Sequence, residues 1–260
     1  TELGIPVFHP ESAKDETFLK DLSLLEPDLC LTAAYGNFLP KRFLSIPKYG
    51  TVNIHPSLLP LYRGASPVQR CLEQGDKTSG VTVLYTELEM DAGPIIAQET
   101  YDINDSIKAD ELLTLLFQKG TELFIRSLSK IFTKPFSGEM QDHSKATHAK
   151  KIEVHESFLD FNRSALECHN KVRAFNMWPG TKGHFLLAGN QVEIKIITTE
   201  VSENPKNLKL NEISLGLQTI DICCGDKKVL SIKELQLPGK KIVSARDFMN
   251  GLKGQSLTLI

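Results

Sequence analysis

The sequence has little of what would assign it to a specialised class. Its five cysteines are an odd number and include no Cys-x-x-Cys pair, so neither a disulfide framework nor a zinc cluster is indicated and a reducing compartment fits. No apolar run reaches the roughly 18 residues of a membrane span, so we expect no membrane partner. The chain does not begin with Met, and we expect it to begin inside a longer protein, which makes the lack of a signal sequence uninformative.

Charge of one sign is not abundant either. Residues 1–135 hold 13 Lys and Arg against 18 Asp and Glu, a net charge of −5, and residues 136–260 hold 17 against 14, a net charge of +3. The second half could therefore attract a polyanion, although nucleic-acid-binding domains are usually more basic. An ordinary solvated surface is the alternative that this charge leaves open.

The apolar pattern of the first half predicts strands that alternate with helices. Helical spacing predicts helices over residues 15–25, 67–74 and 109–132, and short apolar runs predict strands over residues 28–34, 51–55, 81–86 and 95–103. Alternation of this kind is typical of an α/β layer with a mainly parallel sheet. Ligands of such sheets bind beyond the carboxyl ends of the strands, so polar residues there are candidates for a site.

A composition rich in Pro, Gly, Ser, Lys and His marks a change near residue 135. We therefore expect a first domain over residues 1–135, a linker over residues 136–153 and a second domain over residues 154–260. In the second domain turn signals separate short strand candidates, which indicates a small barrel. The predicted strands are residues 184–187, 191–199, 217–223 and 228–237, and the predicted helices are residues 164–175 and 244–250, the latter with Ser244 as its N-cap.

One stretch carries groups suited to polar chemistry. Asn53 and His55 are two residues apart in a predicted strand, so their side chains project from one face. Asp91 follows 36 residues after His55, in a Met-Asp-Ala-Gly-Pro turn. An amide, an imidazole and a carboxylate at strand ends and in loops suit acid–base chemistry. Taken singly, His55 could be a core histidine, and Asn53 and Asp91 could simply form turns. No metal is expected, because no group of potential ligands has the required spacing.

Around these residues the sequence resembles the folate-dependent formyltransferases. The run Asn-x-His-x-Ser-Leu-Leu-Pro at residues 53–60, Gly64 and the Asp91 turn carry the resemblance. Three further segments are similar to methionyl-tRNA formyltransferases, namely residues 146–152, 173–180 and 237–248. The resemblance therefore covers essentially the whole chain. The resemblance implies a formyltransferase Rossmann-like domain with a mainly parallel sheet and a C-terminal OB-like β-barrel. Family members normally begin with further strands that do not precede Thr1 here, so we expect an N-terminally truncated sheet.

The resemblance also implies a reaction and a set of roles. The family moves a formyl group from 10-formyltetrahydrofolate to the α-amine of initiator methionyl-tRNA. Asn53 and a protonated His55 would donate hydrogen bonds to the developing oxyanion, and Asp91 would favour the imidazolium and relay protons. The residues expected to bind the folate are Tyr35, Gly36, Asn37, Phe38, Leu39, Ser57, Leu58, Leu59 and Pro60. The candidate contacts to tRNA phosphates, each of which could singly be ordinary surface, are Lys150, Lys151, Arg173, Lys240 and Lys241.

Two alternative functions stay open at this point. One is another 10-formyltetrahydrofolate enzyme, which acts on a nucleotide-sugar or ribonucleotide amine or hydrolyses the donor. The predicted barrel and the Trp-Pro-Gly segment at residues 178–180 argue against it. The other is an inactive chain whose barrel remains as an RNA-binding or structural module. Residues 53–64 are similar to plant-type organellar members, which implies a mitochondrion or a plastid, with a bacterial cytoplasm as the alternative, and we expect a monomer.

Overall fold

The computed structural model of the chain describes residues 3–133 and 138–260, which form two compact units. The second unit is made of residues 68–77, 103–112 and 151–260, and the other described residues make the first unit. The domain limits expected above stay predictions, and residues 136–137 of the expected linker lie outside the described residues.

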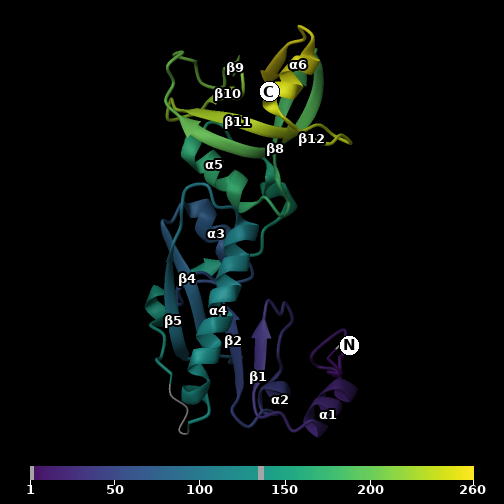
Figure 1. Cartoon of the computed structure of the whole chain (residues 1–260), viewed down its shortest axis with the longest axis vertical. Helices are drawn as coiled ribbons and strands as arrows, with labels where there is room; N and C mark the ends of the chain where they lie inside the picture. The colour runs from purple at the N-terminus through teal and green to yellow at the C-terminus, as the bar shows by residue number, and fades with distance from the viewer. Residues whose placement is uncertain (1–2, 134–137) are drawn as a thin grey trace. The chain divides into compact units, whose positions relative to one another are not determined.

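A four-stranded sheet forms the centre of the first unit (Figure 1). Its order is β1 (Cys30–Ala33), β2 (Thr51–His55), β4 (Thr78–Tyr85) and β5 (Ile95–Asp102). The parallel pairing that the sequence predicts is confirmed for β1 and β2, whereas β4 pairs antiparallel with both β2 and β5. Only nine residues, 86–94, join β4 to β5, and a connection of that length joins antiparallel strands, because a parallel crossover needs about a dozen residues or more.

Helix α4 (Ala109–Ile131) lies across this sheet, as Figure 1 shows. A Cβ atom added at Gly120 would stand 2.4 Å from the Ile54 side chain and 2.8 Å from that of Val81. The glycine therefore allows the helix backbone to approach β2 and β4 closely. Leu123 and Ile131 of the helix join Val52 and Val83 of the strands in one buried apolar cluster. The other helices of this unit are the short α1 (Glu16–Leu24) and α2 (Lys41–Leu44).

A second, very short pair of strands joins two segments of the first unit that are distant in the sequence. Strand β3 (Arg63–Gly64) pairs in parallel with β6 (His148–Ala149), just after the 3₁₀ helix η1 (His143–Lys145). The described part of the expected linker up to residue 150 thus belongs to the first unit and pairs with it. Composition alone did not reveal this, because two-residue strands have no detectable apolar period.

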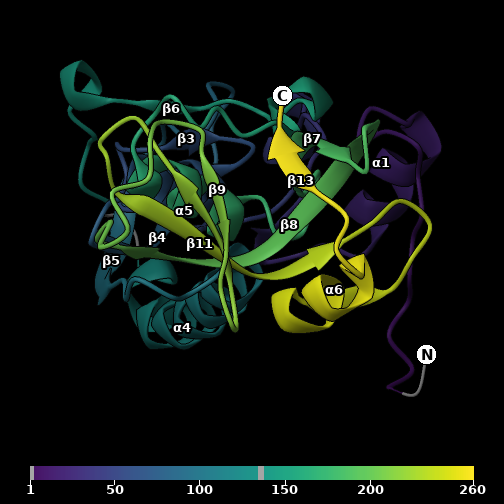
Figure 2. The same cartoon turned by 90° about the horizontal axis from the view of Figure 1, so that it is seen from above.

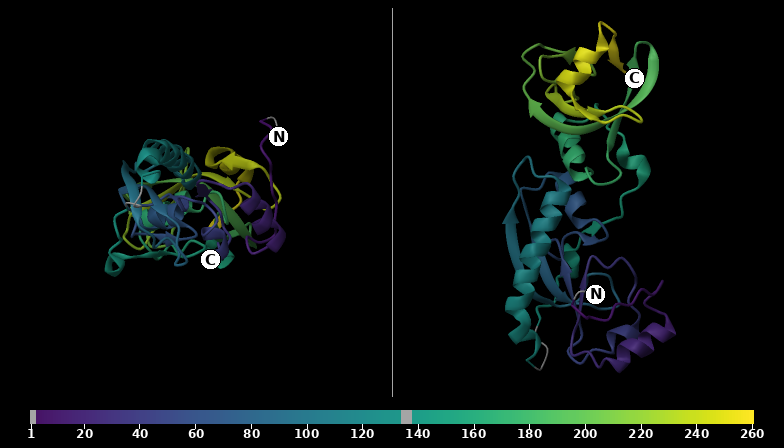
Figure 3. Two further views of the ribbon diagram at one scale, coloured as in Figure 1. Left: turned by 90° about the horizontal axis from the view of Figure 1, so that it is seen from below. Right: turned by 45° about the vertical axis from the view of Figure 1, so that its right-hand side comes forward.

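The second unit is built on an antiparallel sheet that curves into a nearly closed barrel (Figures 2 and 3). Its order is β13, β7, β8, β11, β10, β9, and residues of β13 and β9 at the two ends come into contact. The predicted barrel is therefore confirmed. The strands are β7 (Thr181–Leu187), β8 (Asn190–Ser202), β9 (Ile213–Leu215), β10 (Ile220–Cys223), β11 (Val229–Gln236), β12 (Ile242–Ser244) and β13 (Leu257–Leu259).

Helices α5 (Ala165–Ala174) and α6 (Ala245–Leu252) pack against the barrel and contribute to its core. The unit also contains most of α3 (Pro67–Gln74) and the 3₁₀ helix η2 (Val154–Ser157). As predicted, the Ser244 hydroxyl accepts a hydrogen bond from the Asp247 amide and caps α6. Phe185, Ile222 and Leu230, each at most 1 % exposed, belong to the single apolar cluster at the centre of the unit.

His169 of α5 is a half-buried titratable group in the second unit. Its Nε2 lies 3.0 Å from the Asp105 carbonyl oxygen and its Nδ1 lies 2.9 Å from Thr199 Oγ1. The carbonyl can only accept, so Nε2 carries the proton and Nδ1 accepts from the threonine hydroxyl. Burial lowers the pKa of His169 below its ordinary value, although the Asp105 carbonyl and nearby carboxylates oppose this change.

We expect this histidine to make the fold sensitive to mild acid. Because its pKa is lower in the folded than in the unfolded chain, its contribution to stability is complete above the unfolded pKa of about 6.5 and is lost as the pH falls through the folded pKa. The melting temperature should therefore fall more between pH 7.5 and pH 5 for the native chain than for His169→Gln, which cannot take up a proton. Equal losses in both proteins would contradict this.

Candidate active site

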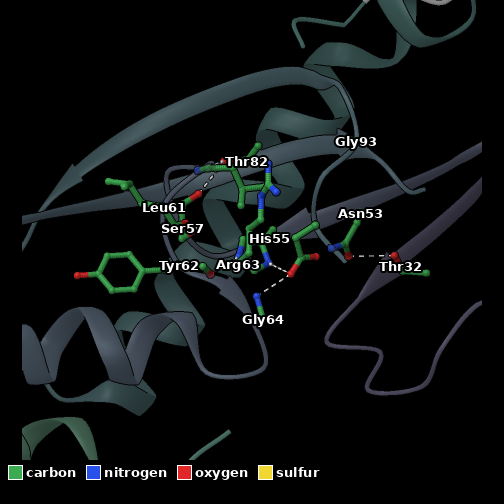
Figure 4. Close-up of polar contacts among 12 residues, drawn as sticks. Thr32, Asn53, His55, Ser57, Leu61, Tyr62, Arg63, Gly64, Thr82 and Gly93 are labelled. Atoms are coloured by element: carbon green, nitrogen blue, oxygen red, sulfur yellow. Dashed lines mark hydrogen bonds and ion pairs between the residues drawn. The ribbon is translucent and has the colours of Figure 1, made fainter. Parts of the chain in front are cut away.

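Asn53 lies in β2 opposite Thr32 of β1, so the strand register sets the orientation of its amide. Thr32 Oγ1 donates a hydrogen bond of 2.9 Å to Asn53 Oδ1, as Figure 4 shows. This hydrogen bond uses the acceptor oxygen of the Asn53 side chain. The two N–H groups of Asn53 Nδ2 can then donate to a different acceptor.

His55 is the last residue of β2 and is only 4 % exposed. Its Nε2 lies 3.0 Å from the Tyr62 carbonyl oxygen. Since a carbonyl accepts, Nε2 must carry a proton, and the neutral ring then has its lone pair on Nδ1. Nδ1 faces Asp91 Oδ2 at 3.7 Å, a distance that suits an ion pair when the ring is protonated.

Asp91 lies in the connection between β4 and β5 and has a positive φ of 52°. Its Oδ2 accepts a 2.8 Å hydrogen bond from the Gly64 amide. The turn lies close against β4, because a Cβ added at Gly93 would stand 1.9 Å from the Tyr85 carbonyl oxygen. Only glycine fits there without a shift of the turn. The structure thus brings His55 and Asp91 together, and it places the predicted Asn53 in the same strand as His55.

The backbone of residues 62–64 contacts both groups, through the Tyr62 carbonyl to His55 and through the Gly64 amide to Asp91. This stretch is itself held by Thr147, whose Oγ1 accepts from the Tyr62 amide and whose carbonyl accepts from the Arg63 amide, both at 2.8 Å. The segment expected to be a linker is therefore part of the support of the site.

Comparison with known proteins gives a consistent result over both units. The formyl transferase model matches residues 3–128, and the model of the formyl transferase C-terminal domain matches residues 151–253. A methionyl-tRNA formyltransferase of Methylococcus capsulatus is 38 % identical over 249 residues, which are 96 % of this chain and 79 % of the relative. That of Thermotoga neapolitana is 37 % identical over 250 residues, again 96 % of this chain and 78 % of the relative.

The chain belongs to the methionyl-tRNA formyltransferase family. The resemblance described from the sequence is thereby confirmed.

Solved structures agree with this family at the level of the fold. WlaRD, a sugar 3N-formyl transferase in the presence of dTDP and 5-N-formyl-THF, is similar with a TM-score of 0.64 at 19 % identity, over 85 % of this chain and 77 % of that one. HypX of Aquifex aeolicus in complex with tetrahydrofolic acid is similar with a TM-score of 0.60 at 18 % identity, over 95 % of this chain and 42 % of that one.

The segments predicted to bind folate lie beside His55. Ala33 at the end of β1 is in register with Ile54, so residues 35–39 follow directly beyond the same edge of the sheet. Tyr35 and Phe38 expose their rings, with 43 % and 57 % of each residue accessible, whereas Leu39 is buried. Gly36 and Asn37 are also exposed.

The turn at residues 57–60 is held by an internal hydrogen-bond network. The Ser57 hydroxyl donates to the Leu61 carbonyl, as expected of a turn serine rather than a nucleophile. Thr82 Oγ1 donates to the Ser57 carbonyl and accepts from the Leu59 amide. Leu58 is half-buried and Leu59 is 3 % exposed. The turn is therefore ordered by β4 as well as by its own residues.

The basic residues proposed for tRNA contact separate into two kinds. Lys150, Lys151, Lys240 and Lys241 are exposed. Arg173 is a correction, because it is 3 % exposed and its guanidinium donates to Asn170 Oδ1 at 3.0 Å. Burial also lowers the pKa of Arg173 below its ordinary value. Arg173 supports the fold of the second unit and is not available to a phosphate.

Within residues 3–133 and 138–260, none of the helices combines the length and the apolar character that a bilayer span requires. The same residues include no group of three or more His, Cys, Asp and Glu side chains that could hold a metal ion.

Sequence reasoning missed the supporting side chains. Thr32 and Gln141 contact the predicted site residues Asn53 and Asp91. Arg63 and Thr147 bind Gln141 and Tyr62 next to them. For Thr32 a signal existed, since it lies in the strand expected next to that of Asn53. For Gln141 and Thr147 there was none, because their contacts join positions about 50 to 85 residues apart in the chain.

We expect Thr32→Val to lower the formyl-transfer rate roughly tenfold or less, because it removes one hydrogen bond worth about 0.5–1.5 kcal/mol while keeping the side-chain shape. Steady-state kinetics of purified protein would measure this. Thr32→Ser keeps the hydroxyl and is the matched control, with a rate near that of the native chain. A Val variant as active as the Ser variant would show that Asn53 needs no orientation by β1.

Proposed function

We propose that the protein transfers the formyl group of 10-formyltetrahydrofolate to the α-amine of methionyl-tRNA. The observation that carries this proposal is the arrangement of Asn53, His55 and Asp91 at the end of β2 and in the adjoining turn, in a chain 38 % identical to a methionyl-tRNA formyltransferase over 96 % of its length. A binding module would not need an imidazole and a carboxylate so close together inside the protein.

Each of the three groups has a place in formyl transfer. The amine nitrogen forms a bond to the formyl carbon, and the bond from that carbon to the folate nitrogen breaks. Asn53 Nδ2 and a protonated His55 Nδ1 supply hydrogen bonds to the formyl oxygen while it carries negative charge. Asp91 faces His55 Nδ1, and its carboxylate can accept the proton that leaves the amine and pass it to the departing folate nitrogen.

The folate co-substrate fits the surface beside these groups. Its flat ring suits a platform of apolar and aromatic side chains together with backbone donors and acceptors. In the first unit the exposed side chains of this kind near the site belong to Tyr35 and Phe38 after β1, Leu61 after the 57–60 turn, and Leu88 and Met90 before Asp91. The co-substrate supplies the formyl group, and the chain supplies position, donors and a proton acceptor.

The second unit is proposed to hold the tRNA. Its exposed Lys240 and Lys241 lie together between β11 and β12 and can pair with phosphates. The tRNA substrate separates this proposal from transfer to a sugar or ribonucleotide amine. A mitochondrion or plastid as the compartment and a monomeric state stay predictions from the sequence.

His55→Ala and Asp91→Ala should each nearly abolish turnover. Loss of one oxyanion donor costs about 100- to 1,000-fold in rate in comparable sites, and loss of general acid–base help costs about 100- to 10,000-fold. The assay is formyl transfer from 10-formyltetrahydrofolate to charged initiator methionyl-tRNA, with uncharged tRNA as the substrate control and His9→Ala as an exposed-histidine control. A variant that folds and retains native turnover would exclude its residue from the chemistry. No turnover by the native chain would overturn the proposed function.

Binding of tRNA should depend on salt through the exposed lysines. We expect Lys240→Ala with Lys241→Ala to weaken tRNA binding and to reduce the slope of log K against log salt by about 2, one for each lost phosphate contact. Filter binding or fluorescence titration at several salt concentrations would measure the slope. Lys209→Ala, which removes another exposed lysine of the second unit, is the matched control. An unchanged slope would remove these lysines from the tRNA interface.

A further inference from the structure

Two buried polar side chains next to Asp91 have no part in the chemistry described above. Arg63 is 3 % exposed and Gln141 is 6 % exposed. Arg63 Nε and Nη2 donate to Gln141 Oε1 at 3.1 and 2.7 Å. Gln141 Nε2 in turn donates to the carbonyl oxygens of Asp91 and Gly93, both at 2.8 Å. The Gln141 amide therefore accepts from Arg63 through its oxygen and donates to the turn through its nitrogen.

These contacts hold Asp91 at both of its ends. The carboxylate accepts from the amide of Gly64, and the backbone carbonyl accepts from Gln141, which is bound to Arg63. Arg63 and Gly64 are neighbours in the chain, so the two anchors converge on one dipeptide. Arg63 Nη1 also lies 3.5 Å from Glu89 Oε1 in the same connection as Asp91. A shift of the turn would break several of these contacts together.

The turn needs such support because its conformation is not the intrinsic preference of its residues. Asp91 has a φ of 52°, a left-handed conformation that aspartate tolerates better than most residues but that is still a minority state of the free chain. The carboxylate stands 3.7 Å from His55 Nδ1, close enough for an ion pair and just beyond hydrogen-bond distance, so a small displacement decides whether the two groups form a hydrogen bond. An error of about 1 Å in the position of a reacting group can cost about 100-fold in rate.

We propose that Gln141 is a positioning residue, which sets the distance between Asp91 and His55 by binding the Asp91 and Gly93 carbonyls while Arg63 fixes its amide oxygen. This inference rests on the proposed formyl transfer for its kinetic consequence. Gln141 touches neither substrate in this scheme and acts only through the turn. Among side chains of this size only an amide can accept from Arg63 and donate to two carbonyls at once.

The chemistry of the amide allows its two contacts to be separated by substitution. Gln141→Glu keeps an acceptor for Arg63, and it places a carboxylate oxygen against the two carbonyl oxygens, so the turn loses its anchor. Gln141→Leu loses both contacts. If Gln141 positions Asp91, both variants lose activity. If it serves only to pair Arg63, the Glu variant behaves as the native chain does.

The first measurement is steady-state formyl transfer. We expect kcat to fall about 10- to 100-fold in both Gln141 variants, with the KM for 10-formyltetrahydrofolate and for methionyl-tRNA unchanged. Ile131→Val is the matched control for general destabilisation, because Ile131 is a fully buried member of the first unit's core and lies in α4. It should lower the melting temperature and leave kcat at the native value. A Glu variant with native kcat would overturn the proposal.

The second measurement does not depend on activity. The Gly64 amide donates to the Asp91 carboxylate, whereas the nearby Ser66 amide donates to the Ala149 carbonyl. Amide hydrogen exchange followed residue by residue by NMR should quicken at Gly64 in Gln141→Glu and stay unchanged at Ser66. Native exchange at Gly64 would overturn the proposal even in a chain without turnover, and faster exchange there would support it. Failure of the positioning role and failure of the proposed function are thereby distinguished.

Discussion

The candidate site depends on the backbone of residues 62–64, because this stretch contacts both titratable groups. The Tyr62 carbonyl determines which nitrogen of His55 carries a proton, and the Gly64 amide holds one oxygen of Asp91. Neither contact uses a side chain that an apolar pattern would reveal. The stretch is ordered in turn by Thr147 and by the pairing of β3 with β6. A segment distant in the chain thus decides the geometry of the two groups that would move protons.

Strand register performs the corresponding task for Asn53. Parallel pairing of β1 with β2 places Thr32 directly opposite Asn53, and the threonine hydroxyl then occupies the amide oxygen. The same register brings residues 35–39 to the edge where His55 ends β2. The antiparallel addition of β4 supplies Thr82, which holds the 57–60 turn, and leads through a short connection to Asp91. One sheet therefore aligns the groups proposed for catalysis and those proposed for folate binding.

The second unit shows why a surplus of positive charge is a weak guide to a polyanion site. Arg70 binds Glu156 at 2.7 Å, and this pairing raises the pKa of the arginine and lowers that of the glutamate. Arg173 is buried against Asn170. The Arg70 guanidinium thereby joins α3 to η2, and Nη1 of Arg173 joins α5 to the Asn104 carbonyl oxygen. Exposed lysines such as Lys240 and Lys241 are better placed than these arginines to attract a phosphate.

Much of this protein follows from its sequence alone. The sequence predicted the long helices, strand β2, the barrel and the family. These predictions rest on apolar periods and on an eight-residue motif, which are local properties of the chain. The same motif and the turn after it led to the prediction of Asn53, His55 and Asp91 as site residues. The sequence did not predict the antiparallel direction of β4 and β5, and it did not predict that Arg173 is buried. It also did not predict that residues 138–150 belong to the first unit. Gln141 and Thr147 were missed for the same reason: their contacts join distant parts of the chain, and only tertiary packing decides which backbone groups they meet.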